Sequence, residues 1–507
     1  MKKYLKIAVA FSAIGAIGLV ASCKKFVAYS PQDSYTVSAQ TYLASQTDYQ
    51  TMEISVYTPL QWLNQLVQIG DVASDNSVAG GESASDVLDL QQVDQYKVTA
   101  TNSTLTGLWQ YAYEGVNRAN YLTEYEITNP AGQQINFPGK DEMYGEVYFL
   151  RAFYYFTLVK LFGGVPLFTD KRLDFASSGT LTRATPAQVY AQIEADLNKA
   201  ISVLPTVQLQ QGRATKYAAE ALLGKVYLYE KKYSDAATVL QSVIDANAFT
   251  LVPKVDSIFA PSGENGPESV FEIQYTNTSP YYQWSNPFQG QGNYAVQQFG
   301  VREMAGTNGM PYAAGWSTGL PTADLYNAYE DGDQRREATC FDVAAYVTAN
   351  PQFNITYEVA PYENTGYYNK KYQPLIGQTS GQPELNYANN YRTIRYADVL
   401  LMAAEAYNRS TSPDDTKAQL YLNMVRRRAF EVTDASHDIT TTGTALYTSI
   451  LNERRLELAM EGERFFDLVR TGLAGTTIPG FIVGKNEVFP IPQEEVNVSG
   501  LPQNPHY

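Results

Sequence analysis

The most continuous apolar pattern after residue 40 covers residues 147–159, which read Val-Tyr-Phe-Leu-Arg-Ala-Phe-Tyr-Tyr-Phe-Thr-Leu-Val. Apolar side chains fall on nearly every face at a helical period, which is typical of a helix buried on most sides. Gly163 and Gly164, followed by Pro166, end the pattern, because glycine permits a C-terminal turn and proline blocks further helix. The hydrophobic pattern predicts helices at 60–69, 106–125, 141–162 and 187–203.

Two pairs of helical patterns have the spacing of tetratricopeptide repeats. The first pair carries Leu223, Gly224, Tyr227, Ala236 and Leu240, and the small residues allow two antiparallel helices to approach closely. A weaker copy carries Ala404, Tyr407, Ala418 and Leu422. Hairpins of this kind bury their apolar faces only against stacked neighbours. We therefore expect the flanking helices at 141–162 and 447–461 to complete one superhelix.

Residues 251–390 interrupt the helical patterns with a long segment rich in Gly, Pro, Asn, Gln and Tyr, in which only short strand patterns such as 270–275 remain. Long irregular segments of compact proteins are usually functional. The predicted fold class is mainly α, a tetratricopeptide-like superhelix of helical hairpins with a large loop-rich insertion carrying short strands. A single domain is predicted at 46–507, with a helical scaffold at about 46–250 and 391–470, a loop-rich region at about 251–390 and a C-terminal segment at 471–507.

The N-terminus has the pattern of an export signal. Three lysines precede an apolar run from residue 7 to residue 20, and Val20-Ala21-Ser22 leads into Cys23. This order predicts a lipoprotein signal peptide at 1–22, lipidation of Cys23 and a tether at 23–45. The alternative is an ordinary secretory signal with a chance cysteine. A lipid on Cys23 would anchor the chain to a membrane without spanning it.

Composition narrows the function classes. The formal charge is −15, and loss of the three lysines of residues 1–22 changes it to −18, which argues against nucleic acid and against attraction to an anionic membrane. If Cys23 is lipidated, Cys340 has no partner for a disulfide. The chain has 40 tyrosines and only two histidines, a composition that favours a binding protein over a hydrolase.

Several motifs together resemble one known family. Residues 150–156, Leu-Arg-Ala-Phe-Tyr-Tyr-Phe, with residues 162–167, Phe-Gly-Gly-Val-Pro-Leu, resemble the signature of the SusD/RagB family of outer-membrane lipoproteins. Further segments agree in the same order at 109–120, 395–407, 453–470 and 490–505. The resemblance spans the whole chain after the signal, and its order is more specific than any single motif.

The resemblance implies both a function and a partner. It implies a helical fold whose loop-rich region binds oligosaccharides, and a SusC-like TonB-dependent outer-membrane transporter over which the lipoprotein sits as a lid. It also implies an outer-membrane location facing the cell surface. One departure concerns the leaflet: surface-exposed members often have acidic residues after the lipidated cysteine, whereas Lys24 and Lys25 follow Cys23 here.

Aromatic residues in the loop-rich region are the candidate ligand contacts. Sugar rings stack their C–H faces on aromatic rings, while their hydroxyls need amide or carboxylate partners. One run of six residues supplies both kinds of group, and a second stretch between two glycines supplies further rings. The candidate ligand-binding residues are Tyr281, Tyr282, Trp284, Asn286, Tyr312, Trp316 and, in an earlier segment, Asn76. Trp62 and Trp109 lie in helical patterns and are predicted to be structural.

No catalytic or metal-binding pattern emerges. The two histidines, His437 and His506, lack spaced cysteine or histidine partners. Asp71 and Asp75 form the most suggestive carboxylate pair, but a turn or helix-cap role is the stronger interpretation. We predict no enzymatic activity and no cofactor, and leave a structural calcium ion open. Charged residues between 453 and 464 are spaced as intrahelical ion pairs and are interpreted as structural.

These patterns favour a non-catalytic, lipid-anchored, glycan-binding subunit of an outer-membrane importer. Three alternatives remain. The first is a peptide-binding subunit of a peptide importer, since some relatives within the family serve that role. The second is a hydrolase that uses loop carboxylates. The third is a scaffolding lipoprotein whose repeats hold other envelope proteins.

Overall fold

The computed structural model describes residues 42–173, 181–284, 288–382 and 384–507. The predicted signal peptide, Cys23, most of the tether and Asn286 therefore lie outside the described residues. The chain divides into two compact units, one made of residues 1–48 and 127–135, the other of residues 49–126 and 136–507. In the first unit, Thr128 and Gln134 form an antiparallel bridge. Everything below concerns the second unit. The predicted domain boundaries stay a prediction.

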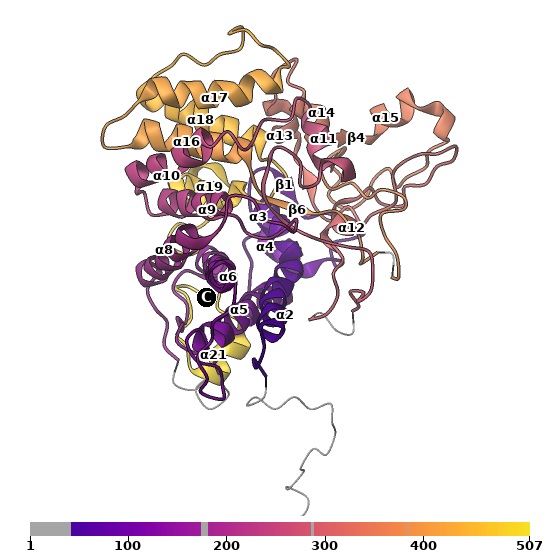
Figure 1. Cartoon of the computed structure of the whole chain (residues 1–507). Helices are drawn as coiled ribbons and strands as arrows, with labels where there is room; N and C mark the ends of the chain where they lie inside the picture. Colours follow the sequence, from indigo (N-terminus) through magenta and orange to yellow (C-terminus); the bar gives the residue numbers. More distant parts are fainter. Residues whose placement is uncertain (1–41, 174–180, 285–287, 383) are drawn as a thin grey trace, which may run out of the picture. The chain divides into compact units, whose positions relative to one another are not determined.

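Eight helices form a stacked scaffold in which most pack on the helix before them in the chain, while α17 and α18 both pack on α16 (Figure 1). They are α5 (Ser103–Glu124), α6 (Lys140–Phe162), α8 (Pro186–Val203), α9 (Lys216–Tyr229), α10 (Tyr233–Asp245), α16 (Tyr396–Arg409), α17 (Asp415–Ala429) and α18 (Gly443–Glu457). The predicted mainly α fold of stacked hairpins is confirmed. Within the described ranges, no helix combines the length and the apolarity needed to cross a bilayer.

Shorter elements flank this scaffold. The remaining N-terminal ones are α2 (Gln46–Tyr57), the 3-10 helix η1 (Thr58–Gln65), α3 (Leu66–Val72), β1 (Ser77–Val78) and α4 (Leu88–Asp94), and the C-terminal ones are α19 (Arg464–Thr471), α20 (Ala474–Thr477) and α21 (Gln493–Ser499). The sequence predicts a single helix at 60–69, whereas the structure has η1 followed by α3. Pro59 lies in the first turn of η1, where its missing N–H leaves no helical hydrogen bond unmade.

The helix ends follow from local chemistry. Nearly every residue of α6 is buried, as its apolar pattern predicts, and Gly163 ends it with φ of 72°. Pro186 occupies the first turn of α8, and Thr185 and Gln188 form a reciprocal capping box. Ordinary capping rules thus place these boundaries close to their predicted positions.

The α9–α10 hairpin shows why a tetratricopeptide repeat needs a small residue. A Cβ added to Gly224 in α9 would lie 2.5 Å from Leu240 Cδ2 in α10, so only glycine permits this approach. The second hairpin, α16–α17, joins the first through Gln241, whose side-chain oxygen accepts hydrogen bonds from the hydroxyls of Tyr407 (2.6 Å) and Tyr421 (2.8 Å). Both predicted repeats are therefore real hairpins, and they pack on each other.

The loop-rich region lies beside the scaffold and contains only short elements (Figure 1). They are α11 (Val255–Phe259), η2 (Pro261–Gly263), β2 (Ser269–Ile273), α12 (Ala295–Phe299), β3 (Leu320–Pro321), α13 (Ala323–Ala328), α14 (Arg335–Thr339), β4 (Cys340–Asp342), α15 (Val343–Ala349), η3 (Pro351–Phe353) and β5 (Tyr367–Asn369). Strand β2 pairs antiparallel with β6 (Tyr391–Arg395), directly before α16, and so closes the region onto the scaffold. The predicted strand at 270–275 is confirmed within two residues.

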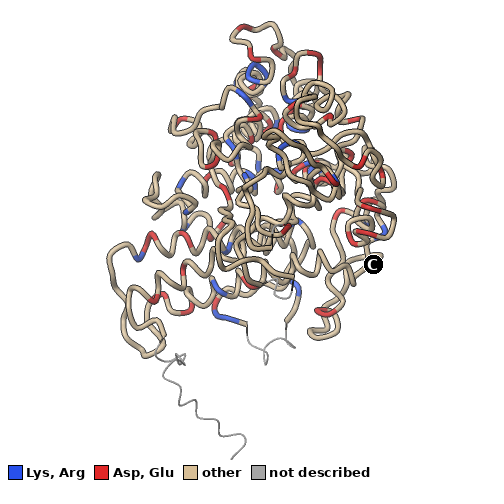
Figure 2. The backbone as a smooth tube through the Cα atoms, turned by 90° about the vertical axis from the view of Figure 1, so that its right-hand side faces the viewer, with Lys and Arg blue, Asp and Glu red and all other residues tan. Residues whose placement is uncertain are grey.

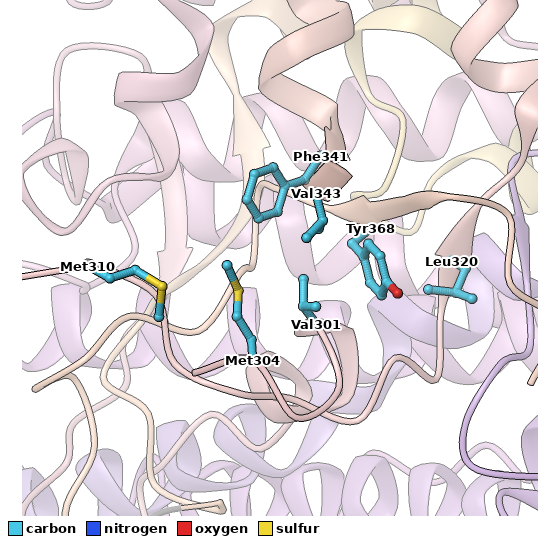
Figure 3. Close-up of a cluster of buried hydrophobic side chains, with 7 residues drawn as sticks. All are labelled: Val301, Met304, Met310, Leu320, Phe341, Val343 and Tyr368. Carbon is cyan, nitrogen blue, oxygen red and sulfur yellow. The ribbon is translucent and has the colours of Figure 1, made fainter. Parts of the chain in front are cut away.

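The loop-rich region has a hydrophobic core of its own. Strand β1 pairs with β3, and β4 pairs with β5, both antiparallel. Seven buried side chains gather around these strands (Figure 3): Val301, Met304, Met310, Leu320, Phe341, Val343 and Tyr368. An irregular backbone that encloses such a core can hold its surface side chains in fixed positions.

A buried ionic network ties the loop-rich region to the scaffold. Glu457, the last residue of α18, is fully buried and accepts hydrogen bonds from Arg395 (3.0 Å), Arg335 (3.2 Å) and Arg428. Glu461 pairs with Arg395 (2.7 Å). The predicted structural role holds, but the predicted intrahelical pairing is wrong, because the partners come from α14, β6 and α17. Acidic and basic residues accordingly lie interspersed along the backbone in Figure 2.

Candidate functional site

Four aromatic side chains of the loop-rich region pack together and form what we call the aromatic platform: Tyr282, Trp284, Tyr294 and Trp316. The indoles of Trp284 and Trp316 are nearly parallel, with 12° between their planes and 6.2 Å between centroids. Tyr294 meets both indoles edge-on, at 5.2 Å from Trp284 and 5.9 Å from Trp316. Tyr282 stacks on Tyr294 at 6.1 Å. The two indoles therefore lie parallel to each other and pack on the edge of Tyr294, which Tyr282 supports from behind.

Exposure differs sharply within the platform. Tyr282 and Tyr294 are buried over the side chain of Leu385, and Trp316 is half-buried against them. The side chain of Trp284 is 52% exposed, unusual for an indole in a packed cluster. Large aromatic faces are normally covered, and an exposed face on a rigid support is typical of a binding surface.

The backbone under the platform is fixed by side-chain amides and by pairing of two loop segments. Asn386 accepts a hydrogen bond from the Tyr282 N–H (2.7 Å) and donates one to its carbonyl oxygen (3.2 Å). The Trp316 N–H donates to the Gln297 carbonyl at 2.8 Å. The preceding Gly315 N–H donates to Val301 at 2.8 Å. These contacts fix the backbone at Tyr282 and at Trp316 without regular secondary structure.

A polar cavity of about 350 Å³ adjoins the platform and shares Tyr294 with it. Side chains from η1, α3, α4, the start of α5 and α12 meet here, so the cavity lies where the scaffold and the loop-rich region join. Its lining residues are Gln65, Gln68, Asp86, Val87, Leu88, Asp89, Leu90, Thr104, Tyr294 and Gln298. The carboxylates and amides of this set are the groups that hydrogen-bond to hydroxyls.

Arg302 connects the platform to the cavity rim. Its guanidinium donates to the Trp316 carbonyl oxygen at 3.3 Å. It also pairs with Glu82 (2.8 Å), Glu358 (3.0 Å) and, more distantly, Asp86 (3.9 Å). Arg302 thereby holds the 82–86 segment beside the platform.

The predicted site residues do not all meet. The structure brings Tyr282, Trp284 and Trp316 together, while the ring of Tyr281 packs over Gly381. Tyr312 lies in the separate cluster of Phe341 and Tyr346, at 5.1 and 5.3 Å between ring centroids.

Asn76 is completely buried, and its side-chain oxygen accepts a hydrogen bond from Arg455 at 2.8 Å. Asn76 and Tyr312 therefore do not belong to the candidate site. The buried amide of Asn76 is bound to arginine, and the ring of Tyr312 packs in another cluster, so both stabilise the fold. Asn286 lies outside the described residues.

The sequence patterns do not identify Tyr294 or the cavity residues as part of the site. Tyr294 follows Trp284 in the same Gly- and Asn-rich stretch, so its aromatic ring was a usable signal. Gln65, Gln68 and Asp86 lie some 200 positions away in sequence and carry no motif. Only the tertiary fold brings them to the platform.

Comparison with known proteins identifies the family. Residues 29–228 match a family described as starch-binding and associating with the outer membrane, and residues 267–486 match the SusD family. A solved laminarin-binding SusD-like protein is 35% identical, with a TM-score of 0.80 over 91% of this chain and 100% of that chain. The chain belongs to the SusD/RagB family.

Other members of the SusD/RagB family are similar over nine-tenths or more of the chain. SusD-like protein P2 of Formosa agariphila is 27% identical over 94% of both chains. Surface glycan-binding protein A of Bacteroides thetaiotaomicron, solved in complex with laminarihexaose, is 28% identical, with a TM-score of 0.79 over 90% of this chain and 99% of that chain. The SusD fold found here thus extends across nearly all of the described residues.

Other tryptophans of this SusD-family chain are structural, as predicted. Trp62 and Trp109 are 3% and 2% exposed. Trp62 contacts Phe288 edge-on, with 5.7 Å between centroids, and Phe288 in turn contacts Tyr111 at 5.3 Å. The deeply buried indoles support the scaffold, so Trp284 and Trp316 are the tryptophans available to a ligand.

Asp71 and Asp75 do not form an acid–base pair. Asp71 is fully buried, accepts a hydrogen bond from the Gly462 N–H at 3.2 Å, and burial raises its pKa well above the ordinary value. Burial also opposes ionisation of Asp75, but its hydrogen bonds to Arg464 (2.8 and 2.9 Å) and the nearby arginine charges lower its pKa. Neither residue lines the cavity beside the platform. Among the described residues, no group of three His, Cys, Asp or Glu side chains is placed to hold a metal ion.

A different carboxylate pair lies in a second cavity of this SusD-family chain, of about 290 Å³. Glu53 of α2 and Glu146 of α6 share Arg213, whose guanidinium lies 2.8 Å from Glu53 and 3.0 Å from Glu146. Burial and the Glu146 charge raise the pKa of Glu53 to about 8, although Arg213 lowers it. Both carboxylates accept from the same nitrogen, Nη1 of Arg213, and Glu146 also accepts from the Tyr57 hydroxyl, so both are bound within the fold. The pair is therefore better explained as a structural ionic cluster that holds a proton than as the catalytic carboxylates of a hydrolase.

This pair makes stability depend on pH. The pKa of Glu53 in the folded protein lies above its ordinary value of 4.5, so folding takes up a proton. The free energy of unfolding therefore falls as the pH rises from 4.5 to 8. Because Gln cannot titrate, we expect the stability of Glu53→Gln relative to the wild type to rise by about 2 kcal/mol from about pH 5 to about pH 8. Urea denaturation at both pH values measures this, with Asp141→Asn on exposed α6 surface as control. A stability difference that stays constant with pH would contradict the assignment.

Proposed function

We propose that this protein is a non-catalytic, lipid-anchored glycan-binding subunit at the outer membrane, which captures oligosaccharides and delivers them to a SusC-like TonB-dependent transporter. The half-exposed face of Trp284, held parallel to Trp316 beside a polar cavity, carries this proposal. One sugar face can stack on the indole while its hydroxyls reach the amides and carboxylates of the cavity.

The chemistry of the platform suits reversible capture. Stacking on an aromatic ring contributes about 0.5–1.5 kcal/mol beyond burial, and a net hydrogen bond contributes about 1 kcal/mol. A few such contacts, reduced by the costs of association, give roughly micromolar to millimolar dissociation constants. Weak binding allows the protein to release its cargo to a transporter.

Two further observations support the proposal. One similar solved protein is named as laminarin-binding, and another, a surface glycan-binding protein, was solved in complex with laminarihexaose. One matching family is described as associating with the outer membrane. The basic start, apolar run and Cys23 of the sequence support lipid anchoring at that membrane. The transporter partner rests on membership of the family alone.

Affinity electrophoresis through a panel of polysaccharides tests the function. We expect the purified protein to be retarded in a gel containing at least one glycan, with laminarin, starch, xylan and mannan as the first set. Incubation with the retarding glycan should release no reducing ends, because no bond is broken. Retardation by none of the glycans together with binding to a protein digest would replace the proposal with peptide capture, and release of new reducing ends would replace it with hydrolysis.

A further inference from the structure

The cavity beside the platform offers mainly hydrogen-bond acceptors. The Gln65 side chain makes no hydrogen bond to any other described residue. The carboxylate of Asp86 uses one oxygen, Oδ2, which accepts from the Glu82 N–H at 2.8 Å. The carboxylate of Asp89 likewise uses Oδ2, which accepts from Ser103 and Thr104 at the start of α5 (2.8 Å and 3.1 Å). One oxygen of each carboxylate is left to accept a hydrogen bond from a ligand.

The charge around the platform is strongly negative. Glu82, Asp86, Asp89 and Glu358 place four carboxylates at the cavity and its rim, and Arg302 supplies one positive charge, which leaves a formal charge of −3. Arg302 is also committed to Glu82, Asp86 and Glu358 and to the Trp316 carbonyl oxygen, so it is not free to receive an anion. Tyr294 lines the cavity together with Asp86, and its ring contacts Trp284 at 5.2 Å between centroids, so this local charge lies close to a ligand stacked on Trp284 and is screened little at low salt.

We infer that the site selects uncharged, hydroxyl-rich glycans and rejects carboxylated or sulfated ones, with Glu82 and Asp86 as the specificity-determining residues. This inference rests on the proposed function and narrows its substrate class. Neutral sugar hydroxyls donate to the acceptor oxygens of the cavity. An anionic sugar cannot donate from its charged group, meets the carboxylates at close range and finds no unpaired cation among the described residues of this site.

A matched pair of probes tests the selectivity. Laminarihexaose is the neutral probe, and laminarihexaose with its primary hydroxyls oxidised to carboxylates is the anionic one. By calorimetry at about 50 mM NaCl, we expect the wild-type protein to bind the neutral probe at least about tenfold more tightly. Raising the salt to about 500 mM should leave neutral binding within about twofold and narrow the difference, because salt screens the repulsion.

Removal of the charges tests the named residues. The double variant Glu82→Gln and Asp86→Asn keeps hydrogen-bonding side chains, and we expect the ratio of neutral to anionic affinity to fall about three- to tenfold, while neutral binding itself weakens because the amide of Asn is a poorer acceptor than the carboxylate of Asp86. Asp331→Asn, a fully exposed carboxylate between α13 and α14, is the control for net charge and should change neither probe.

The outcomes separate the two proposals. Equal binding of both probes, or a double variant that keeps the wild-type ratio while still binding the neutral probe, would overturn the selectivity and leave glycan capture standing. Failure of the neutral probe and of every glycan of the panel would overturn glycan capture and the selectivity with it. The salt series on the wild-type protein decides the selectivity even if the double variant fails to fold.

Discussion

Replacing Trp284 with alanine is expected to weaken glycan binding at least about tenfold, because the largest exposed aromatic face of the platform disappears. The Trp284 side chain is 52% exposed, so its loss should cost little folding stability, less than about 1 kcal/mol. Calorimetric titration with the best glycan of the panel measures the affinity, and thermal denaturation measures the stability. Trp284→Phe should keep part of the affinity, because a smaller ring still stacks.

A second, partly buried aromatic pair provides the control. Tyr326 and Tyr367 stack at 4.1 Å between centroids, with 13° between their planes, away from the platform cavity. Tyr367→Ala removes a stacked, partly buried aromatic ring outside the platform and should leave affinity within about twofold. An unchanged affinity in Trp284→Ala, or an equal loss in both variants, would show that the platform is not the binding surface.

Glu457→Gln is expected to be the most destabilising single change in the scaffold, with a loss of about 3–5 kcal/mol at neutral pH. Glu457 is fully buried and faces Arg335, Arg395 and Arg428, so loss of its charge removes a carboxylate that three buried guanidinium groups share. Urea denaturation followed by circular dichroism measures the change.

The Glu457 carboxylate also makes the folding stability sensitive to acid. Burial opposes ionisation of Glu457, but the charges of Arg428, Arg395 and Arg335 outweigh it and hold its pKa well below the ordinary value of 4.5. Because the folded pKa is depressed, this stabilisation is present above about pH 4.5 and is lost as the pH falls further. The difference between wild type and Glu457→Gln should therefore shrink in acid.

A surface carboxylate tests whether burial decides the effect. Glu330 pairs with Arg426 at 2.6 Å, but its side chain is 54% exposed. We expect Glu330→Gln to cost less than about 1 kcal/mol, the usual range for a solvated pair. Equal losses in Glu330→Gln and Glu457→Gln would contradict the view that the buried network holds the loop-rich region on the scaffold.

Much of the helical scaffold is predictable from local sequence. The all-round apolar pattern of α6, the Thr185–Pro186 start of α8 and the small Gly224 of the first hairpin each depend on neighbours within one or two helices. Such features are encoded by periodicity and capping, which sequence displays directly. The ion pairs of Glu457 cannot be predicted in this way. The spacing of the charged residues around it suits intrahelical pairing, and only the tertiary fold brings Arg335 and Arg395 to it.

The site divides in the same way. Trp284 and Trp316 are recognisable because large aromatic residues in an irregular, Gly-rich segment cannot all be covered by that segment. The same reasoning fails for Tyr312, because the loop-rich region builds its own core and Phe341 and Tyr346 cover that ring. Gln65 and Asp86 enter the site from segments distant in sequence, so only the fold reveals them.

The most direct test of the account is a crystal structure of the protein with its best-binding oligosaccharide. We expect one sugar ring to lie flat on Trp284 within about 4 Å, with a hydroxyl group of the glycan donating to Gln65 or Asp86. A glycan bound at another surface, with the Trp284 face still open to solvent, would contradict the account.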